Sequence, residues 1–226
     1  MYCNLESRAL LKISGTDAES FLQAQFSNDL LLLDDHSIQL NAYCQHQGKV
    51  IALFWVMRFK DSFLLSFPKE LSEIVRTRLQ MFVILADVLI EDISDQAVQI
   101  GLIYEDHANA YLVNENLSLL IDSSGEVNQE MTITHDEWTK SCIDFQIPEV
   151  FLNTSEKFVP QMLNLDINEI GVNFSKGCYP GQEVVARLHY LGKAKRRLFT
   201  FQSDSEMQIG ENLYCASSKA AKARGD

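Results

Sequence analysis

The chain has 226 residues and a mass of 25.7 kDa, a length that accommodates one or two compact domains. Hydrophobic residues make up 46% and charged residues 22%, a globular composition that excludes disordered, collagen-like and low-complexity classes. No apolar stretch reaches the roughly 18 residues of a membrane span, and the amino terminus lacks the basic and apolar blocks of a signal peptide. We therefore expect a cytoplasmic protein with no membrane partner.

The charge of the chain is strongly acidic. Nineteen basic and 31 acidic residues give a net charge of −12, which opposes nucleic-acid binding over most of the surface. The segment from Arg187 to Arg197 is an exception, because five of its residues are basic and none is acidic. It is either a solvated turn or a local site for an anionic group. The five cysteines form no C-x-x-C pair, which argues against zinc ribbons, thioredoxin-like sites and disulfide frameworks.

The first predicted elements are a strand and a helix. Residues 8–14 predict a short strand that ends at Gly15. Thr16 and Glu19 then match a capping box, in which two side chains satisfy backbone amides at the start of a helix. The apolar residues that follow recur at helical spacing and line one face: Ala18, Phe21, Leu22 and Phe26. We therefore predict a buried amphipathic helix here.

The next hundred residues predict an antiparallel sheet with a helix on one face. The pattern gives a turn at 47–49, a hairpin of strands 50–59 and 63–67, a helix over 71–79 and a strand at 86–90. This order of elements is typical of an α+β layer. Residues 94–133 have a weaker mixed pattern with a turn at Ser123–Gly125. The fold class predicted from the sequence is therefore α+β.

The most informative segment is Lys176–Glu183, with the sequence K-G-C-Y-P-G-Q-E. Its glycines permit unusual backbone dihedrals, and a short helix is predicted from Gln182 onward. Cys178 precedes that helix and follows Lys176 closely, and positive potential in such a place favours the thiolate. Cys178 is therefore either a reactive thiol, for which His189 is a possible base, or a small residue buried in a turn.

A second candidate lies just upstream. Gln161, Asn164 and Asp166 alternate with apolar residues. Amide and carboxylate groups arranged in this way can bind the polar edge of a heterocycle while the apolar side chains pack inward. The same pattern also fits a polar edge strand or a turn.

The segment from Gly171 to Arg187, continued by Lys195–Leu198, resembles the signature of the YgfZ family. These are folate-binding proteins related to the aminomethyltransferase (T-protein) of the glycine cleavage system. Weaker similarity covers nearly the whole chain in order, including Leu11–Gly15, Gln47–Val50 and Phe158–Leu165. The resemblance implies intertwined antiparallel-sheet subdomains around a central cavity over residues 1–197.

The same resemblance implies a C-terminal β-barrel after residue 197, of which residues 198–226 supply only the start. Its first strands are expected at Leu198–Phe201 and Asn212–Cys215, and residues 216–226 show no strand pattern. The implied function is that of a tetrahydrofolate-binding accessory protein, which supports the assembly or maintenance of iron–sulfur proteins and, through them, tRNA modification. Any effect on tRNA is expected to be indirect.

The resemblance also assigns roles to residues. Trp138 is expected to stack on the folate, with polar contacts from Gln161, Asn164 and Asp166. Arg187 or the basic cluster Lys193–Arg197 would bind the anionic tail. The remaining folate-binding candidates come from the signature segment: Lys176, Gly177, Tyr179, Gly181, Gln182 and Glu183. Cys178 is expected to be a redox thiol or a transient cluster ligand, with iron–sulfur client or assembly proteins as partners and no stable metal site.

The chain departs from the family pattern at several positions. Gln146 replaces a glycine near Trp138, and Arg8 stands where some members have a folate-contacting tryptophan. Ala52 and Leu53 occupy the positions of the paired aspartates of the aminomethyltransferase, so glycine-cleavage activity is not expected. The alternative function is a folate-dependent one-carbon transferase or demethylase that uses other residues.

Overall fold

A computed structural model of the chain describes residues 1–123, 130–205, 207–208, 211, 213–214 and 223–225. The strands are β1 (Tyr2–Asn4), β2 (Arg8–Ser14), β3 (Gln39–Cys44), β4 (Val50–Phe59), β5 (Ser62–Pro68), β6 (Leu89–Asp92), β7 (Val98–Ile103), β8 (Tyr111–Leu112), β9 (Leu117–Asp122), β10 (Leu213–Tyr214) and β11 (Ala223–Gly225). The α-helices are α1 (Ala18–Gln25), α2 (Ser72–Phe82), α3 (His135–Asp144) and α4 (Gln182–Leu191). Short 3₁₀ helices are η1 (Leu30–Leu32), η2 (Lys69–Leu71), η3 (Leu152–Thr154), η4 (Pro160–Leu163) and η5 (Ile167–Glu169).

The larger sheet has five antiparallel strands in the order β3-β4-β5-β2-β6. Its central hairpin joins β4 to β5 with Phe59 opposite Ser62, which confirms the predicted hairpin. Residues 50–57 of β4 are buried on both faces of the sheet, which explains why this strand is apolar along most of its length rather than alternating with polar residues.

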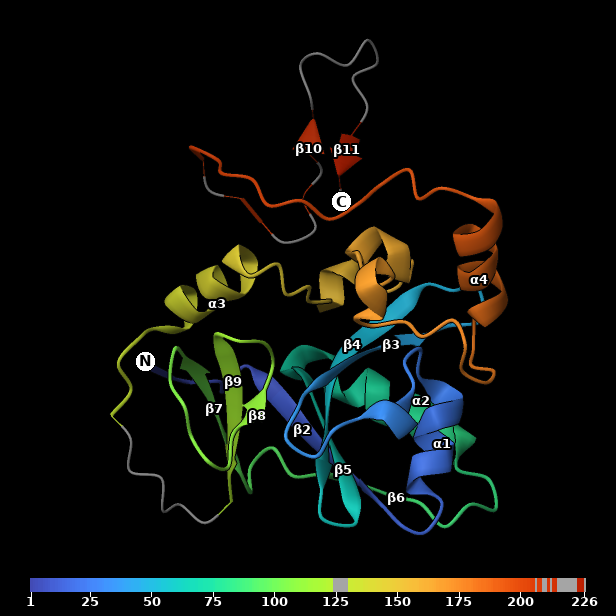
Figure 1. Cartoon of the computed structure of the whole chain (residues 1–226), viewed down its shortest axis with the longest axis horizontal. Helices are drawn as coiled ribbons and strands as arrows, with labels where there is room; N and C mark the ends of the chain where they lie inside the picture. The colour runs from blue at the N-terminus through green and yellow to red at the C-terminus, as the bar shows by residue number, and fades with distance from the viewer. Residues whose placement is uncertain (124–129, 206, 209–210, 212, 215–222, 226) are drawn as a thin grey trace.

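Helices α1 and α2 cover one face of this sheet (Figure 1). Phe21 and Leu22 from α1, and Val75 and Leu79 from α2, share one apolar cluster with the strands. The predicted capping box of α1 is wrong. Thr16 donates its hydroxyl to Asp87 at 2.9 Å, and the helix begins after a residue whose side chain makes no capping bond. A contact with the loop before β6 therefore replaces the expected local one.

The second sheet has the strand order β1-β7-β9-β8 and lies beside the first (Figure 1). Leu117 and Leu119 of β9 pack into the same cluster as Trp55, on the face of the larger sheet away from α1 and α2. The amino-terminal strand β1 belongs to this second sheet, whereas β2 belongs to the first. The chain thus crosses between the two sheets, and the antiparallel α+β class predicted from the sequence is confirmed.

Some predicted strands differ from the observed ones. The strand expected at 86–90 begins only at Leu89, because Asp87 forms backbone bonds with the start of α1. Residues 198–201 form no strand, and the segment is held by Asn164 and Ile143 instead of a ladder partner.

At the carboxyl end, β10 falls inside the expected strand 212–215, of which Asn212 and Cys215 lie outside the described residues. Strand β11, not foreseen from its Ala-Arg-Gly sequence, pairs antiparallel with β10. Residues 124 and 125 of the predicted turn also lie outside the described part of the chain. Among the described residues, no helix combines the length and apolar character that a membrane crossing requires.

Candidate ligand-binding site

A cavity of about 780 Å³ is the main candidate site. Its walls come from the start of β2, the end of β5, α3, residues 146–153, Asn164 and the extended segment 198–201. The volume is in the range of small-molecule and cofactor sites, roughly 300–1,000 Å³. The cavity therefore has room for a ligand of cofactor size.

Helix α3 brings Trp138 to the cavity wall. The helix begins with a capping box between Thr134 and Glu137, in which each side chain accepts from the other's backbone N–H. Trp138 itself is only 3% exposed, and its ring lies against Gly101 and tilts over Trp55 at 6.4 Å between ring centroids. A Cβ at Gly101 would lie 2.5 Å from the Trp138 ring, so the glycine makes this packing possible. Trp138 is thus both a cavity wall and a core residue.

A buried ion pair between Arg8 and Glu149 lines the same cavity. Arg8 Nη1 donates to Glu149 Oε2 at 2.5 Å, and its other nitrogens donate to the hydroxyl and carbonyl of Ser66. The guanidinium also lies over the Trp55 ring at 4.3 Å. Burial raises the pKa of Glu149, and the charge and hydrogen bond of Arg8 oppose that shift. The second carboxylate oxygen, Oε1, is buried and has no hydrogen-bond partner among the described residues.

Another part of the wall is built by Asn164 and the segment that follows α4. Arg197 pairs with both carboxylate oxygens of Asp166 and donates to the Gln161 carbonyl at 2.8 Å. Asn164 donates from Nδ2 to the Leu198 carbonyl at 2.9 Å, while its Oδ1 is buried and has no partner within the described chain. These bonds hold residues 198–201 against the cavity.

Gln146 and Cys142 also line the cavity. Gln146, which stands in place of the family's glycine, has a φ of 57°, in the left-handed region that favours glycine. Cys142 projects from α3, and burial raises the pKa of its thiol to about 12. Its thiol is therefore protonated at neutral pH.

Most of the site residues expected from the sequence lie outside this cavity. Only Trp138 and Asn164 line it. Gln161 is buried and donates from Nε2 to the Val185 carbonyl at 2.7 Å, which ties η4 to α4. Asp166 holds Arg197, so that one member of the basic cluster is engaged inside the protein.

Lys176 of the signature segment is buried and forms hydrogen bonds within the protein. Its ammonium donates to the backbone carbonyls of Gln23, in the last turn of α1, and of Phe26 and Asn28, which follow the helix, at 2.5–2.9 Å. Burial lowers the pKa of Lys176 to about 8, while the charge of Asp29 opposes the shift. The ammonium is therefore directed toward α1 and anchors the loop that contains Cys178.

The two glycine turns of the sequence pack against each other. Gly181 has a φ of 83°, and a Cβ there would lie 2.5 Å from the Gln45 carbonyl oxygen and 2.7 Å from Gly48. Gly48 also has a positive φ, 76°. Tyr179 is buried next to this contact, and burial raises the pKa of its hydroxyl. The turn at 45–48 and the signature segment therefore form one packed unit.

The other members of the signature segment are more accessible. Cys178, Gly177, Glu183 and Arg187 are exposed and Gln182 is half-buried. His189 stacks on Phe174 with 3.7 Å between ring centroids. Within the described part of the chain, no three His, Cys, Asp or Glu side chains gather as metal ligands. The Cys178 side chain is thus exposed at the surface, a few residues before the start of α4.

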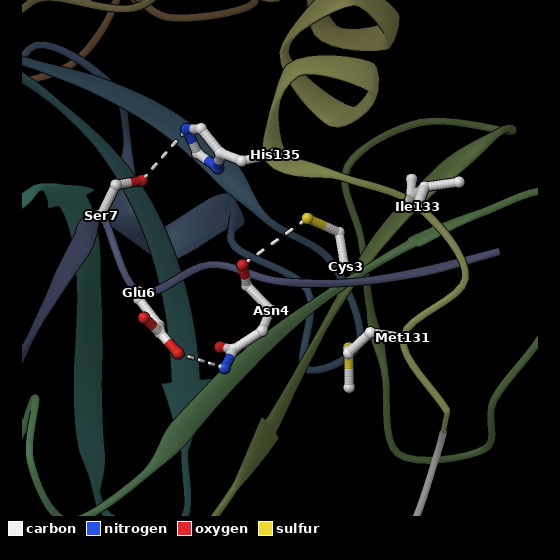
Figure 2. A pocket seen from close by; sticks show the side chains of 7 residues that line it. All are labelled: Cys3, Asn4, Glu6, Ser7, Met131, Ile133 and His135. Atoms are coloured by element: carbon white, nitrogen blue, oxygen red, sulfur yellow. Dashed lines mark hydrogen bonds between the residues drawn. The ribbon is translucent and has the colours of Figure 1, made fainter.

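A smaller cavity of about 410 Å³ adjoins the first at Ser7 and His135 (Figure 2). Its polar groups largely pair with one another. The Ser7 hydroxyl lies 3.4 Å from His135 Nε2, and the Asn4 amide donates to Glu6 at 2.9 Å. Burial raises the pKa of the Cys3 thiol, which lies within reach of the Asn4 carbonyl. None of the buried, unpartnered polar side-chain atoms of the described residues belongs to the lining of this cavity.

Glu149 is not among the site residues predicted from the sequence, and Arg8 enters there only as the replacement of a tryptophan. One signal was available for each residue. Glu149 is a lone charge in the apolar run from Ile147 to Leu152, and Arg8 opens a strand that is otherwise largely apolar. A charge in such a place is either paired or functional, and here the two charges pair across 141 positions of sequence.

The chain has several similar proteins of known name or structure. No protein-family model matches it. It is 31% identical to an uncharacterized protein of Haemophilus influenzae, over 94% of this chain and 78% of the relative. It is 32% identical to the tRNA-modifying protein YgfZ of Colwellia psychrerythraea, over 89% of this chain and 74% of the relative, and 26% identical to that of Aliivibrio fischeri, over 90% and 71%.

Among solved structures, the glycine cleavage system aminomethyltransferase T of Bartonella henselae has a similar fold. The superposition has a TM-score of 0.61 at 10% sequence identity. It covers 83% of this chain and 63% of the transferase, so the chain spans less than two thirds of that structure. At this identity the likeness concerns the fold alone.

Proposed function

Since the chain belongs to the YgfZ family, we propose that it is a tetrahydrofolate-binding accessory protein that supports tRNA modification through the assembly or maintenance of iron–sulfur proteins. Relatives that match most of the chain are named tRNA-modifying proteins. The net charge of −12 favours an indirect effect on tRNA, through protein clients. A cytoplasmic location follows from this role.

The observation that carries the folate proposal is the cavity beside α3. It combines the volume of a cofactor site with an aromatic wall at Trp138 and a buried ion pair. The fold that surrounds it is that of an aminomethyltransferase T. In this proposal residues 1–197 form the folate-binding region and residues 198–226 begin a C-terminal barrel.

An accessory role is favoured over turnover by the residues at the positions of the transferase's paired aspartates and by the bonding of the cavity's carboxylates. Ala52 and Leu53 are fully buried in the larger sheet and provide no acid or base. Of the two carboxylates that line the cavity, Glu70 accepts from the Leu152 amide, and Glu149 is held by Arg8 through one of its oxygens. A one-carbon transferase or demethylase, the alternative function, would have to use one of these two groups as its acid or base.

Folate binding is tested by filling the cavity. Ile143 lines the cavity and is 49% exposed, so Ile143→Trp adds bulk without removing a core side chain. In anaerobic calorimetric titration we expect the unchanged protein to bind tetrahydrofolate and the variant to bind at least tenfold more weakly. Ile74→Trp on α2, on another exposed surface, is the matched control and should bind normally. Absence of saturable binding by the folded, unchanged protein would overturn the proposal.

The iron–sulfur part of the proposal concerns Cys178. Its thiol is exposed in a loop anchored by Lys176, where a partner protein can approach it. We expect Cys178→Ala to reduce iron–sulfur-dependent tRNA modification severalfold in cells that depend on this protein. Ser175→Ala, an exposed position in the same loop, should leave the modification unchanged. Equal modification levels with both variants, at equal protein abundance, would remove the role of Cys178.

A further inference from the structure

We propose that residues 198–201 form a movable strap, which opens to admit a ligand to the cavity beside α3 and closes over the ligand once it is bound. The strap is fixed at its amino-terminal end and weakly held at its other end, so it swings away from α3. The movement can be tested without a ligand. The closing step rests on the proposed function, because it requires a cavity that binds a small molecule such as a reduced folate.

The strap connects two separate parts of the cavity wall. All four of its residues line the cavity, and they form neither helix nor strand. After α4 the chain runs across the molecule towards α3 (Figure 1). On one side, the Asn164 amide donates to the Leu198 carbonyl at 2.9 Å. On the other side, the Thr200 hydroxyl donates to the Ile143 carbonyl of α3 at 3.4 Å. The strap therefore bridges the end of η4 and the end of α3.

The amino-terminal end of the strap is anchored by an arginine. Arg197, the residue before the strap, donates to both carboxylate oxygens of Asp166 and to the Gln161 carbonyl. The Asp166 side chain is 10% exposed, and bidentate arginine–carboxylate pairs are among the stronger hydrogen-bonded contacts in proteins. This end of the strap is therefore the fixed side about which it swings.

The other end of the strap is held much less firmly. The hydrogen bond from Thr200 to Ile143 is long, at 3.4 Å, and both residues are exposed. Phe199 and Phe201 are 79% and 57% exposed, so their side chains contribute little apolar burial to this end. Segments with few buried apolar contacts open at a free energy far below that of global unfolding. The end beside α3 is therefore the end that opens.

The two phenylalanines also favour closure over a ligand. Phe199 and Phe201 line the cavity, yet most of their surface is exposed. A ligand in the cavity offers apolar surface against which these rings can be buried, and that burial favours the closed position of the strap. We therefore expect the strap to slow the dissociation of a ligand more than it changes the association rate.

Labelling of Cys142 with N-ethylmaleimide tests whether the strap moves. Cys142 lines the cavity, is half-buried and lies on α3, the helix beside the end that opens. Asp166→Asn removes the charge that anchors Arg197. We expect the Cys142 thiol to be labelled at least fivefold faster in this variant, as measured by mass spectrometry of its peptide. Cys44, which is 1% exposed in β3, reports unfolding and should stay unlabelled.

Glu156→Gln is the matched control for the labelling experiment. Glu156 forms an arginine–carboxylate pair with Arg78 at 2.8 Å and does not line the cavity, so its replacement should leave the labelling rate of Cys142 unchanged. A folded Asp166→Asn protein that keeps the original labelling rate overturns the inference. If Asp166→Asn does not fold, Thr200→Val, which removes the hydroxyl bond to α3, should raise the rate at least twofold, and an unchanged rate overturns the inference.

The closing step is tested by tetrahydrofolate dissociation in anaerobic stopped-flow experiments. We expect the double variant Phe199→Ala with Phe201→Ala to release tetrahydrofolate at least fivefold faster, with an association rate changed less than twofold. Phe82→Ala, which truncates a 49% exposed phenylalanine at the end of α2, is the control and should keep the original dissociation rate. An unchanged dissociation rate in the folded double variant overturns the closing step. If the folded, unchanged protein binds no tetrahydrofolate, the folate proposal and the closing step both fail, and the labelling of Cys142 decides the movement of the strap independently.

Discussion

Replacing Trp138 with alanine is expected to lower the free energy of unfolding by about 3–5 kcal/mol, the usual cost of deleting a buried aromatic side chain. The ring is 3% exposed and packs against Gly101 of β7 and Trp55 of β4, so it joins α3 to both sheets. Its loss would leave a void that the two sheets cannot close without moving. Urea unfolding followed by circular dichroism would measure the change.

A matched control for this variant is Tyr190→Ala. Tyr190 is an aromatic residue of α4 with 67% exposure, and its removal should change stability by less than about 0.5 kcal/mol. If Trp138→Ala cost no more than this control, the packing described for α3 would be wrong. The expected cost also means that lost folate binding in Trp138→Ala would not by itself demonstrate a contact with the ligand. The Ile143→Trp variant avoids this ambiguity.

Replacing Lys176 with methionine is expected to lower the free energy of unfolding by about 3 kcal/mol, because three backbone carbonyls would lose the ammonium that donates to them. Methionine keeps most of the side-chain volume, so the change isolates the ammonium. We further expect faster amide hydrogen exchange at the end of α1 and in the loop 173–181, since Lys176 joins the two. Urea unfolding and hydrogen exchange would measure the two effects.

Lys193→Met is the control for the loss of a positive charge. Lys193 is exposed in the basic segment after α4, and its replacement should leave stability and exchange nearly unchanged. A cost at Lys176 no larger than that at Lys193 would show that the three carbonyl bonds contribute little. It would also reopen a role for the Lys176 ammonium toward Cys178.

Local patterns in the sequence were sufficient to predict the core elements of the fold. The apolar run at 50–59 became β4, and the helical spacing of Phe21 and Leu22 became the buried face of α1, because burial of apolar side chains acts on each segment separately. The family resemblance added the arrangement of these elements, which the similarity to an aminomethyltransferase T confirmed. The capping box at Thr16 failed because a distant residue, Asp87, competes for the same hydroxyl.

The candidate site depended much more on the tertiary structure. A motif shows which residue types occur together but not which way they face. Only the structure shows that Lys176 bonds to carbonyls at the end of α1 and that Gly181 packs against Gly48, while their folate contacts stay predictions. Arg8 and Glu149 are 141 positions apart, and no periodicity relates them. The spacing of apolar residues determined the α+β elements, and the signature segment carried the resemblance to the family. The cavity and its buried ion pair exist only because folding brings β2, α3 and η4 together, since hydrogen bonding across such distances depends on the final packing of the whole chain.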